Sequence, residues 1–172
     1  MSDEKKPMKY YSSIQEKALA EALGWQKIGG SGAAPCAPGD IKASEWLGEC
    51  KTHVRAHSIY FDADVWKKIN NEAMGHNKKP VLFVDNGTQK IEHTWALCCA
   101  KNINQGHMVV IDFPYTVKKN ITFADEAGRI RLGEAYKEFA GDFYRGIAFE
   151  YKWNDEDVLI MPFETFKENY KR

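Results

Sequence analysis

The spacing of apolar residues near the start of the chain predicts an amphipathic helix. Leu19 and Leu23 recur at helical intervals, which places them on one face. Ser13 and Glu16 have the S-x-x-E spacing of a capping box, so we expect the helix to begin near Ser13, and Gly24 is expected to end it. Glu16 falls in line with the apolar residues. A carboxylate in that position needs a counter-charge or a bound cation.

The next segment predicts a loop followed by a β-hairpin. Residues 29–39 are rich in glycine, alanine and proline, a composition that is typical of irregular structure. Short runs over 40–42 and 46–51 then predict two strands. Successive side chains of a strand point to opposite faces, so Glu49 and Lys51 share one face.

The remaining pattern predicts further helices and strands, and therefore an α/β protein. Asp62 or Asp64 can cap a helix that reaches about Gly75. Residues 80–84 are continuously apolar, as in a strand that is buried on both faces. Further strands are predicted over 91–99, 108–113, 146–153 and 158–161, and helices over 132–139 and 163–170.

Composition predicts one globular domain. The chain has 172 residues, of which 44% are hydrophobic, enough for a single core over residues 1–172. We expect residues 1–11 to form a flexible arm. The longest apolar runs are too short to cross a bilayer and the first residues are polar, which indicates a cytoplasmic protein with no membrane partner. The four cysteines include no CxxC pair, so neither a disulfide framework nor a zinc knuckle is indicated.

Net charge argues against a nucleic-acid partner. Lysine plus arginine and aspartate plus glutamate both total 24, whereas proteins that bind nucleic acids usually carry a basic excess. Basic residues are nevertheless locally dense. They gather at Lys67-Lys68, Lys78-Lys79, Lys118-Lys119 and from Arg129 to Arg131.

Three polar residues of the predicted hairpin suggest phosphodiester chemistry. If Asp40 begins the strand beside Glu49 and Lys51, two carboxylates and one ammonium group converge. Paired carboxylates repel each other unless a cation lies between them, and Mg²⁺ favours such oxygen ligands. A lysine beside that cation can orient a water molecule and offset charge on a phosphate. Each residue also has a simpler interpretation: a solvated pair for Glu49 and Lys51, a turn residue for Asp40, and a helix cap for Glu16.

The same residues resemble a known motif. Asp40, Glu49 and Lys51 fit the PD-(D/E)xK motif of nucleases with the restriction-endonuclease-like fold. The run 30–33, Gly-Ser-Gly-Ala, together with Glu16 in the first helix, is similar to the Holliday junction resolvases of archaea and their phage-encoded relatives. The resemblance covers residues 12–85. It implies a mixed central sheet flanked by helices, with residues 86–172 as an extension of the same domain that adds C-terminal strands and helices.

The resemblance also implies an activity and a set of functional residues. It implies a Mg²⁺-dependent endonuclease that cleaves four-way DNA junctions, with Mn²⁺ as a substitute metal. It also implies a homodimer, which would work in the host cytoplasm if the protein is phage-encoded. The implied catalytic residues are Glu16, Asp40, Glu49 and Lys51; the metal ligands are Glu16, Asp40, Glu49 and the backbone carbonyl of Cys50; the DNA contacts are Ser31, Gly32, Thr52, His53 and Arg55. Two alternatives remain open: a restriction- or repair-type nuclease that cuts duplex or other branched DNA, and a DNA-binding module without catalysis.

Overall fold

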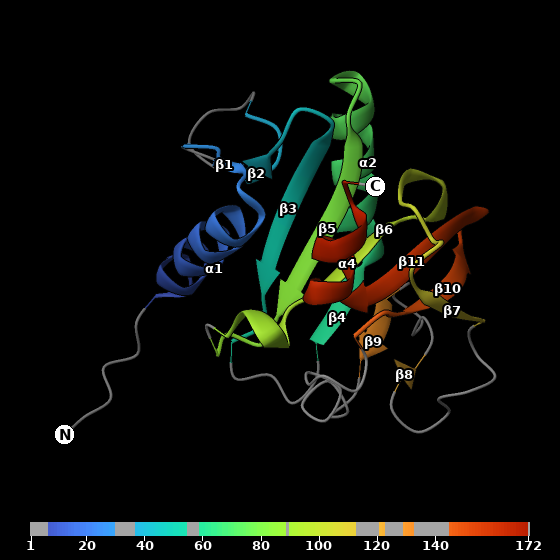
Figure 1. The fold of residues 1–172 in the computed structure, drawn as a ribbon. Helices are drawn as coiled ribbons and strands as arrows, with labels where there is room; N and C mark the ends of the chain where they lie inside the picture. The colour runs from blue at the N-terminus through green and yellow to red at the C-terminus, as the bar shows by residue number, and fades with distance from the viewer. Residues whose placement is uncertain are drawn as a thin grey trace.

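The computed structural model describes residues 7–29, 37–54, 59–88, 90–112, 121–122, 129–132 and 145–171. These residues form an α/β protein with a large mixed sheet flanked by three helices (Figure 1). The helices are α1 (Met8–Leu23), α2 (Ala63–Gly75) and α4 (Phe163–Asn169), with short 3₁₀ helices η1 (Ile91–His93) and η2 (Ala100–Asn102). The strands are β1 (Gln26–Lys27), β2 (Ile41–Lys42), β3 (Trp46–Thr52), β4 (Ile59–Asp62), β5 (Lys79–Asp85), β6 (Trp95–Cys99), β7 (Val109–Asp112), β8 (Ile121–Thr122), β9 (Arg129–Leu132), β10 (Ile147–Trp153) and β11 (Glu156–Pro162).

The strands form two sheets. The larger has the order β1-β2-β3-β5-β6-β11-β10-β7, and the smaller has the order β4-β9-β8. Strands β2 and β3 form the predicted antiparallel hairpin. Strand β5 runs parallel to β3, and α2 lies in the connection between them, because parallel neighbours need a crossover.

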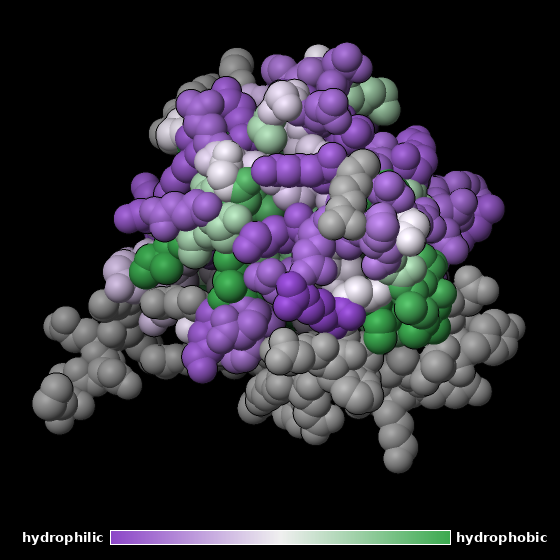
Figure 2. Space-filling model, viewed as in Figure 1, coloured by the Kyte–Doolittle hydropathy of each residue, from purple (hydrophilic) through white to green (hydrophobic). Residues whose placement is uncertain are grey.

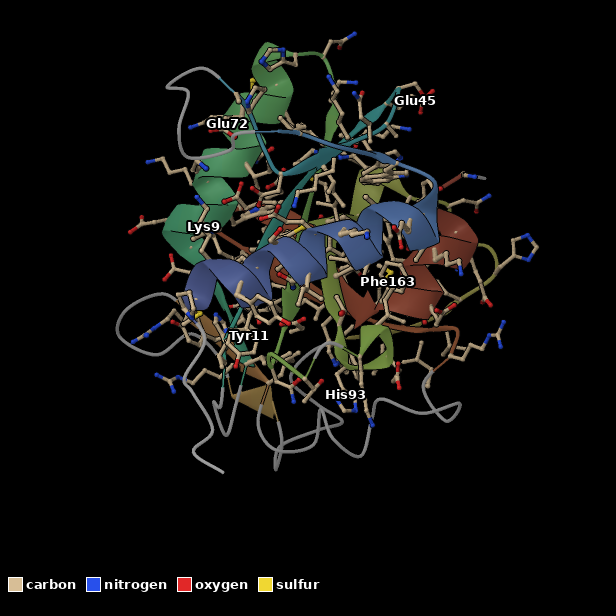
Figure 3. The ribbon with its side chains drawn as sticks, turned by 90° about the vertical axis from the view of Figure 1, so that its left-hand side faces the viewer. Lys9, Tyr11, Glu45, Glu72, His93 and Phe163 are labelled. Carbon is tan, nitrogen blue, oxygen red and sulfur yellow. The ribbon has the colours of Figure 1, made fainter. Side chains whose placement is uncertain are left out.

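Two apolar clusters pack on opposite faces of the large sheet. One cluster joins α1 and α4 to the sheet through residues such as Leu19, Phe83 and Phe166. The other joins α2 and the small sheet to the opposite face through residues such as Ile69 and Leu82. Figure 3 shows α2 and α4 on opposite sides of the sheet. Burial of both faces explains the continuous apolar run of β5.

The described surface is mainly polar. Polar side chains cover most of the coloured part of the face in Figure 2, and the apolar areas within it are small. The exposed large apolar side chains among the described residues are Met8, Tyr10, Met74 and Val109. Among these residues, no helix is long and apolar enough to cross a membrane.

The predicted start of the first helix is wrong. Helix α1 begins at Met8, and its N-cap residue Pro7 provides no side-chain cap. Ser13 and Glu16 therefore lie inside the helix and do not form a capping box, and residues 8–11 belong to the helix instead of a flexible arm. Proline favours a helix start because its φ angle is preset, and no helix breaker separates it from Ser13. Gly24 ends the helix as predicted.

The helix predicted over 132–139 is wrong at its first residue. Leu132 ends strand β9, in which Ile130 and Leu132 are buried while Arg129 and Arg131 are partly exposed. This alternation has the period of a strand, not of a helix. Residues 133–139 lie outside the described part of the chain. The strand predicted over 91–99 begins only at Trp95, after η1, whereas Asp62 caps α2 as predicted.

Candidate active site

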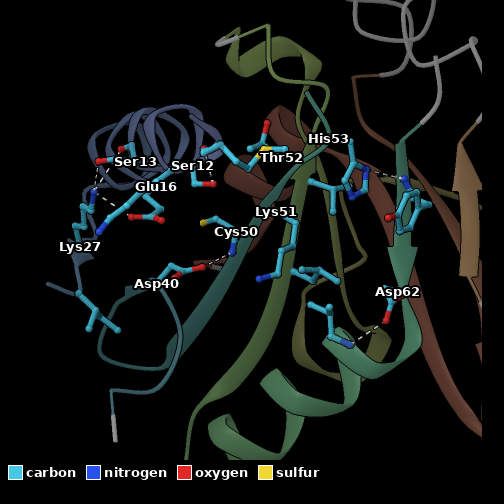
Figure 4. Close-up of a pocket in the computed structure, with 17 residues that line it drawn as sticks. Ser12, Ser13, Glu16, Lys27, Asp40, Cys50, Lys51, Thr52, His53 and Asp62 are labelled. Carbon is cyan, nitrogen blue, oxygen red and sulfur yellow. Dashed lines mark hydrogen bonds and ion pairs between the residues drawn. The ribbon is translucent and has the colours of Figure 1, made fainter. Parts of the chain in front are cut away.

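A pocket of about 910 Å³ opens between α1, the β1–β2 hairpin, the end of β3 and strand β4 (Figure 4). The predicted site residues that line it are Glu16, Asp40, Cys50, Lys51, Thr52 and His53. Glu49 is buried and is not among the residues that line it. Three other predicted residues, Ser31, Gly32 and Arg55, lie outside the described part of the chain. The structure therefore brings predicted residues from α1, from β3 and from the turn before β2 to a single opening.

Asp40 lies directly before β2 and is bonded to the neighbouring strand. Its N–H donates to the carbonyl of Gly48 at 2.8 Å, and its Oδ2 accepts a hydrogen bond from the N–H of Cys50 at 2.8 Å. Pairing between β2 and β3 ends at Gly48. The Asp40 carboxylate therefore accepts the hydrogen bond of the Cys50 N–H group, which has no backbone partner in β2. The N–H and C=O groups of one strand residue point to the same edge. The Cys50 carbonyl is therefore directed toward Asp40.

Glu49 and Lys51 share one face of β3, as the alternation predicted. Lys51 Nζ lies 2.8 Å from Glu49 Oε1, and the Glu49 side chain is only 4% exposed. Burial by itself would lower the pKa of Lys51, but the hydrogen bond and charge of Glu49 and the charge of Asp40 outweigh it and raise that pKa. Lys51 therefore keeps its positive charge at neutral pH.

Helix α2 adds two residues that the sequence pattern did not identify. Lys68 Nζ lies 3.4 Å from both carboxylate oxygens of Glu49 and 3.7 Å from Oε1 of Glu72. Glu72 Oε2 in turn accepts a hydrogen bond from the N–H of Gly39 at 3.1 Å. The helix thus connects Glu49 to the turn that carries Asp40. Lys68 and Glu72 have the i,i+4 spacing of a helical ion pair. That spacing alone does not reveal that both side chains face β3.

Glu16 projects from α1 toward β1. Its Oε2 lies 3.0 Å from Lys27 Nζ, and its side chain is 12% exposed. The same ammonium group donates to the hydroxyl of Ser13 at 3.0 Å. Ser13 and Glu16 therefore share the lysine, and this contact replaces the capping role that their spacing predicted.

The pKa of the Cys50 thiol responds to the acidic groups around it. Burial raises its pKa well above the usual range, and the negative charges of Asp40, Glu16 and Glu49 raise it further. Cys50 therefore remains a protonated thiol, and only its backbone carbonyl suits a metal. Carboxylate and carbonyl oxygens are the ligands that hard cations such as Mg²⁺ prefer.

Lysines balance these carboxylates in the structure. Lys27 pairs with Glu16, and Lys51 pairs with Glu49. Across the described ranges, no group of three or more His, Cys, Asp or Glu side chains is arranged to hold a metal ion. The residues fit a hard cation in donor type. Binding one through Glu16 requires Lys27 to move, and its side chain is 36% exposed.

Thr52 and His53 continue from β3 along the pocket wall. Thr52 is buried, and the His53 ring stacks on Tyr60 with 4.1 Å between ring centroids. The N–H of Tyr60 donates to His53 Nδ1 at 3.3 Å. Burial lowers the pKa of His53 to about 4. The negative charge of Asp62 opposes this shift, and the positive charge of Lys51 adds to it. His53 is therefore neutral at pH 7 and brings no positive charge to a phosphate.

No protein-family model, curated protein or solved structure matches this chain. The functional interpretation consequently depends on the geometry of the pocket and on the motif.

Proposed function

We propose that the protein is a metal-dependent DNA endonuclease of the PD-(D/E)xK type, with a restriction-endonuclease-like core and four-way junctions as its substrate. The observation that carries the proposal is the position of Asp40 beside the Glu49–Lys51 pair at one edge of β3, next to an open pocket. Two carboxylates and a charged lysine at one edge provide the groups that phosphodiester hydrolysis needs.

The order of elements also supports this proposal. The order begins with a helix that carries Glu16, followed by a hairpin that carries Asp40 and the Glu-x-Lys run. A second helix and a buried parallel strand come next. Apart from the start of the first helix, these elements lie within residues 12–85, the part of the chain that the resemblance covers. Helix α2 contributes Lys68 and Glu72, which hold the two halves of the motif together.

Each residue has a specific role in this proposal. Asp40, Glu16, Glu49 and the Cys50 carbonyl provide oxygen ligands for a divalent cation, which when bound polarises the phosphate and lowers the pKa of a water molecule. Lys51 donates hydrogen bonds to the attacking water and to the phosphate oxygens, because its raised pKa keeps it charged. Symmetric cutting of a junction needs two such sites, and we therefore propose a homodimer with a two-fold axis. We place the enzyme in the cytoplasm, where its DNA substrate is accessible.

The test compares a four-way junction with its linear arms, using purified protein and Mg²⁺. We expect preferential cleavage of the junction. Equal cleavage of the linear arms would favour a restriction- or repair-type nuclease, and binding without cleavage would favour a non-catalytic module.

The variants Asp40→Asn, Glu49→Gln, Lys51→Ala and Glu16→Gln test the site itself. Each should reduce the cleavage rate by about 10²–10³ or more, as for other groups that stabilise charge in a transition state, while DNA binding persists. Glu21→Gln and Lys17→Ala are matched controls, because these residues form an exposed pair on the solvent side of α1. Normal cleavage by a folded Asp40, Glu49 or Lys51 variant would contradict the site assignment.

A further inference from the structure

A cluster of aromatic and basic side chains lies beyond the Lys51 end of the pocket. We call it the Tyr60 cluster; it comprises His53, Tyr60, Arg129 and Arg131. Strands β4 and β9 pair with Tyr60 opposite Arg131 and Asp62 opposite Arg129. Ile59, Phe61, Ile130 and Leu132 occupy the alternate positions and are buried in the core. Tyr60 and both arginines therefore share the other face of the small sheet.

The ring of Tyr60 is in contact with all three of its partners. The His53 ring stacks on it with an angle of 19° between the planes. The guanidinium carbon of Arg129 lies 5.0 Å from the ring centroid, and that of Arg131 lies 5.8 Å from it. Both distances are within the range of cation–π attraction. Tyr60 therefore holds two permanently charged groups next to each other.

The cluster adjoins the candidate active site. Tyr60, His53 and Asp62 line the same pocket as Asp40 and Lys51 (Figure 4). Asp62 uses its carboxylate to cap α2, accepting hydrogen bonds from the N–H groups of Asp64 and Val65. His53 is neutral at pH 7, so the positive charge of the cluster comes from the two arginines.

We propose that Arg129 and Arg131 bind the phosphate backbone of the DNA strand that passes through the pocket, beyond the phosphate that is cut. The proposal rests on the nuclease function proposed above and adds a substrate-positioning site to it. Guanidinium groups match phosphate oxygens in geometry and bind them with two parallel hydrogen bonds. Side chains two residues apart on a strand are separated by about 6–7 Å. The two arginines are therefore close enough together to contact neighbouring phosphates of one DNA strand.

The alternative is that the arginines only stabilise the small sheet. The two roles differ in their dependence on salt. A phosphate contact releases counterions when DNA binds, so its loss reduces the slope of log K against log salt concentration by about one. A residue that only supports the fold does not change that slope.

The experiment measures affinity for a four-way junction in Ca²⁺ over a series of salt concentrations. Arg129→Gln and Arg131→Gln should each weaken binding by roughly tenfold at low salt and reduce the salt slope by about one. Single-turnover cleavage in Mg²⁺ should be slower than wild type at subsaturating DNA, and the difference should shrink as the DNA concentration rises. Arg145→Gln is the matched control, because Arg145 pairs with Glu168 of α4, on the opposite face of the large sheet.

Two further variants keep the test decisive if a glutamine variant is unstable. Arg131→Lys retains the charge and should keep the wild-type salt slope, and Tyr60→Phe retains the ring and should bind as the wild type does. Wild-type affinity and salt slope in both folded glutamine variants would overturn this proposal and leave the nuclease function intact. Absence of DNA binding by the wild-type protein would overturn both proposals.

Discussion

Single side chains in this protein take their properties from their neighbours more than from their type. Lys51 stays charged although it is partly buried, because Glu49 and Asp40 surround it. His53 loses its charge because it is buried beside Lys51. These two residues are close in sequence and line the same pocket, yet one provides a fixed cation and the other a neutral aromatic ring.

The lowered pKa of His53 predicts how the stability of the protein depends on pH. The ordinary value of 6.5 applies to the unfolded chain, and the folded value is about 4. Between these values the unfolded state binds a proton that the folded state does not bind. The free energy of unfolding should therefore rise with pH over this window and level off above it. The contribution of His53 to this rise is at most about 1.4 kcal/mol per pH unit.

The variant His53→Phe checks this prediction by urea unfolding at several pH values from 4 to 7. Phenylalanine can stack on Tyr60 but cannot take up a proton, so the stability of the variant should depend less steeply on pH. Loss of the Tyr60 N–H bond to Nδ1 lowers its stability by an amount that does not vary with pH. Parallel curves for the wild type and the variant would show that folding does not lower the pKa of His53.

The hairpin of β2 and β3 determines where Asp40 lies. Gly48 is in close contact with both neighbouring strands: a Cβ atom at this position would lie 2.9 Å from Ile41 Cγ1 and 3.3 Å from Phe83 Cε2. Ile41 directly follows Asp40 and is fully buried. A side chain at position 48 would therefore push β2 away from β3, and Asp40 would move with it.

We predict that Gly48→Ala reduces both stability and cleavage. Overpacking at this contact should cost about 1–3 kcal/mol of unfolding free energy, and displacement of Asp40 should lower the cleavage rate at a temperature where the variant is folded. Gly75→Ala is the control, since a Cβ atom there meets no other atom within 4 Å. Thermal melting and single-turnover cleavage measure the two effects. An active Gly48→Ala variant with unchanged stability would show that the hairpin can adapt.

The molecule as a whole combines zero net charge with strong local charge. Its Lys+Arg and Asp+Glu totals are equal, but the pocket contains both acidic groups, from Glu16 and Asp40, and basic groups, from Lys27 and Lys51. A bound divalent cation would make the local charge positive, because it would neutralise Glu16 and Asp40 and release Lys27. DNA affinity should therefore be stronger in the presence of a divalent cation.

The proposed metal requirement can be tested through the choice of cation. An all-oxygen site suits Mg²⁺ or Mn²⁺, and Ca²⁺ shares these ligands but takes longer bonds and a looser geometry. We predict cleavage with Mg²⁺ or Mn²⁺, binding without cleavage in Ca²⁺, and no cleavage in EDTA. Filter binding and gel assays on one DNA substrate compare the four conditions. Full activity in EDTA would rule out the proposed mechanism.

Local patterns were sufficient to place much of the fold. The cap at Asp62, the hairpin of β2 and β3, and the apolar strand β5 were all predicted, because each depends on residues that are close in sequence. The shared face of Glu49 and Lys51 follows from strand alternation. Asp40 was predicted by the motif and Glu16 by the resemblance to the resolvases, and the structure brings both to the same pocket as Lys51.

Other features depended on long-range packing. Leu132 belongs to a strand because β9 pairs with β4. Lys27, Lys68, Tyr60 and the two arginines of the Tyr60 cluster come from other elements than β3. Sequence spacing gives the face of an element on which a residue lies. The partner that this face meets is settled only when the sheets and helices pack together, because each such contact joins residues far apart in the chain.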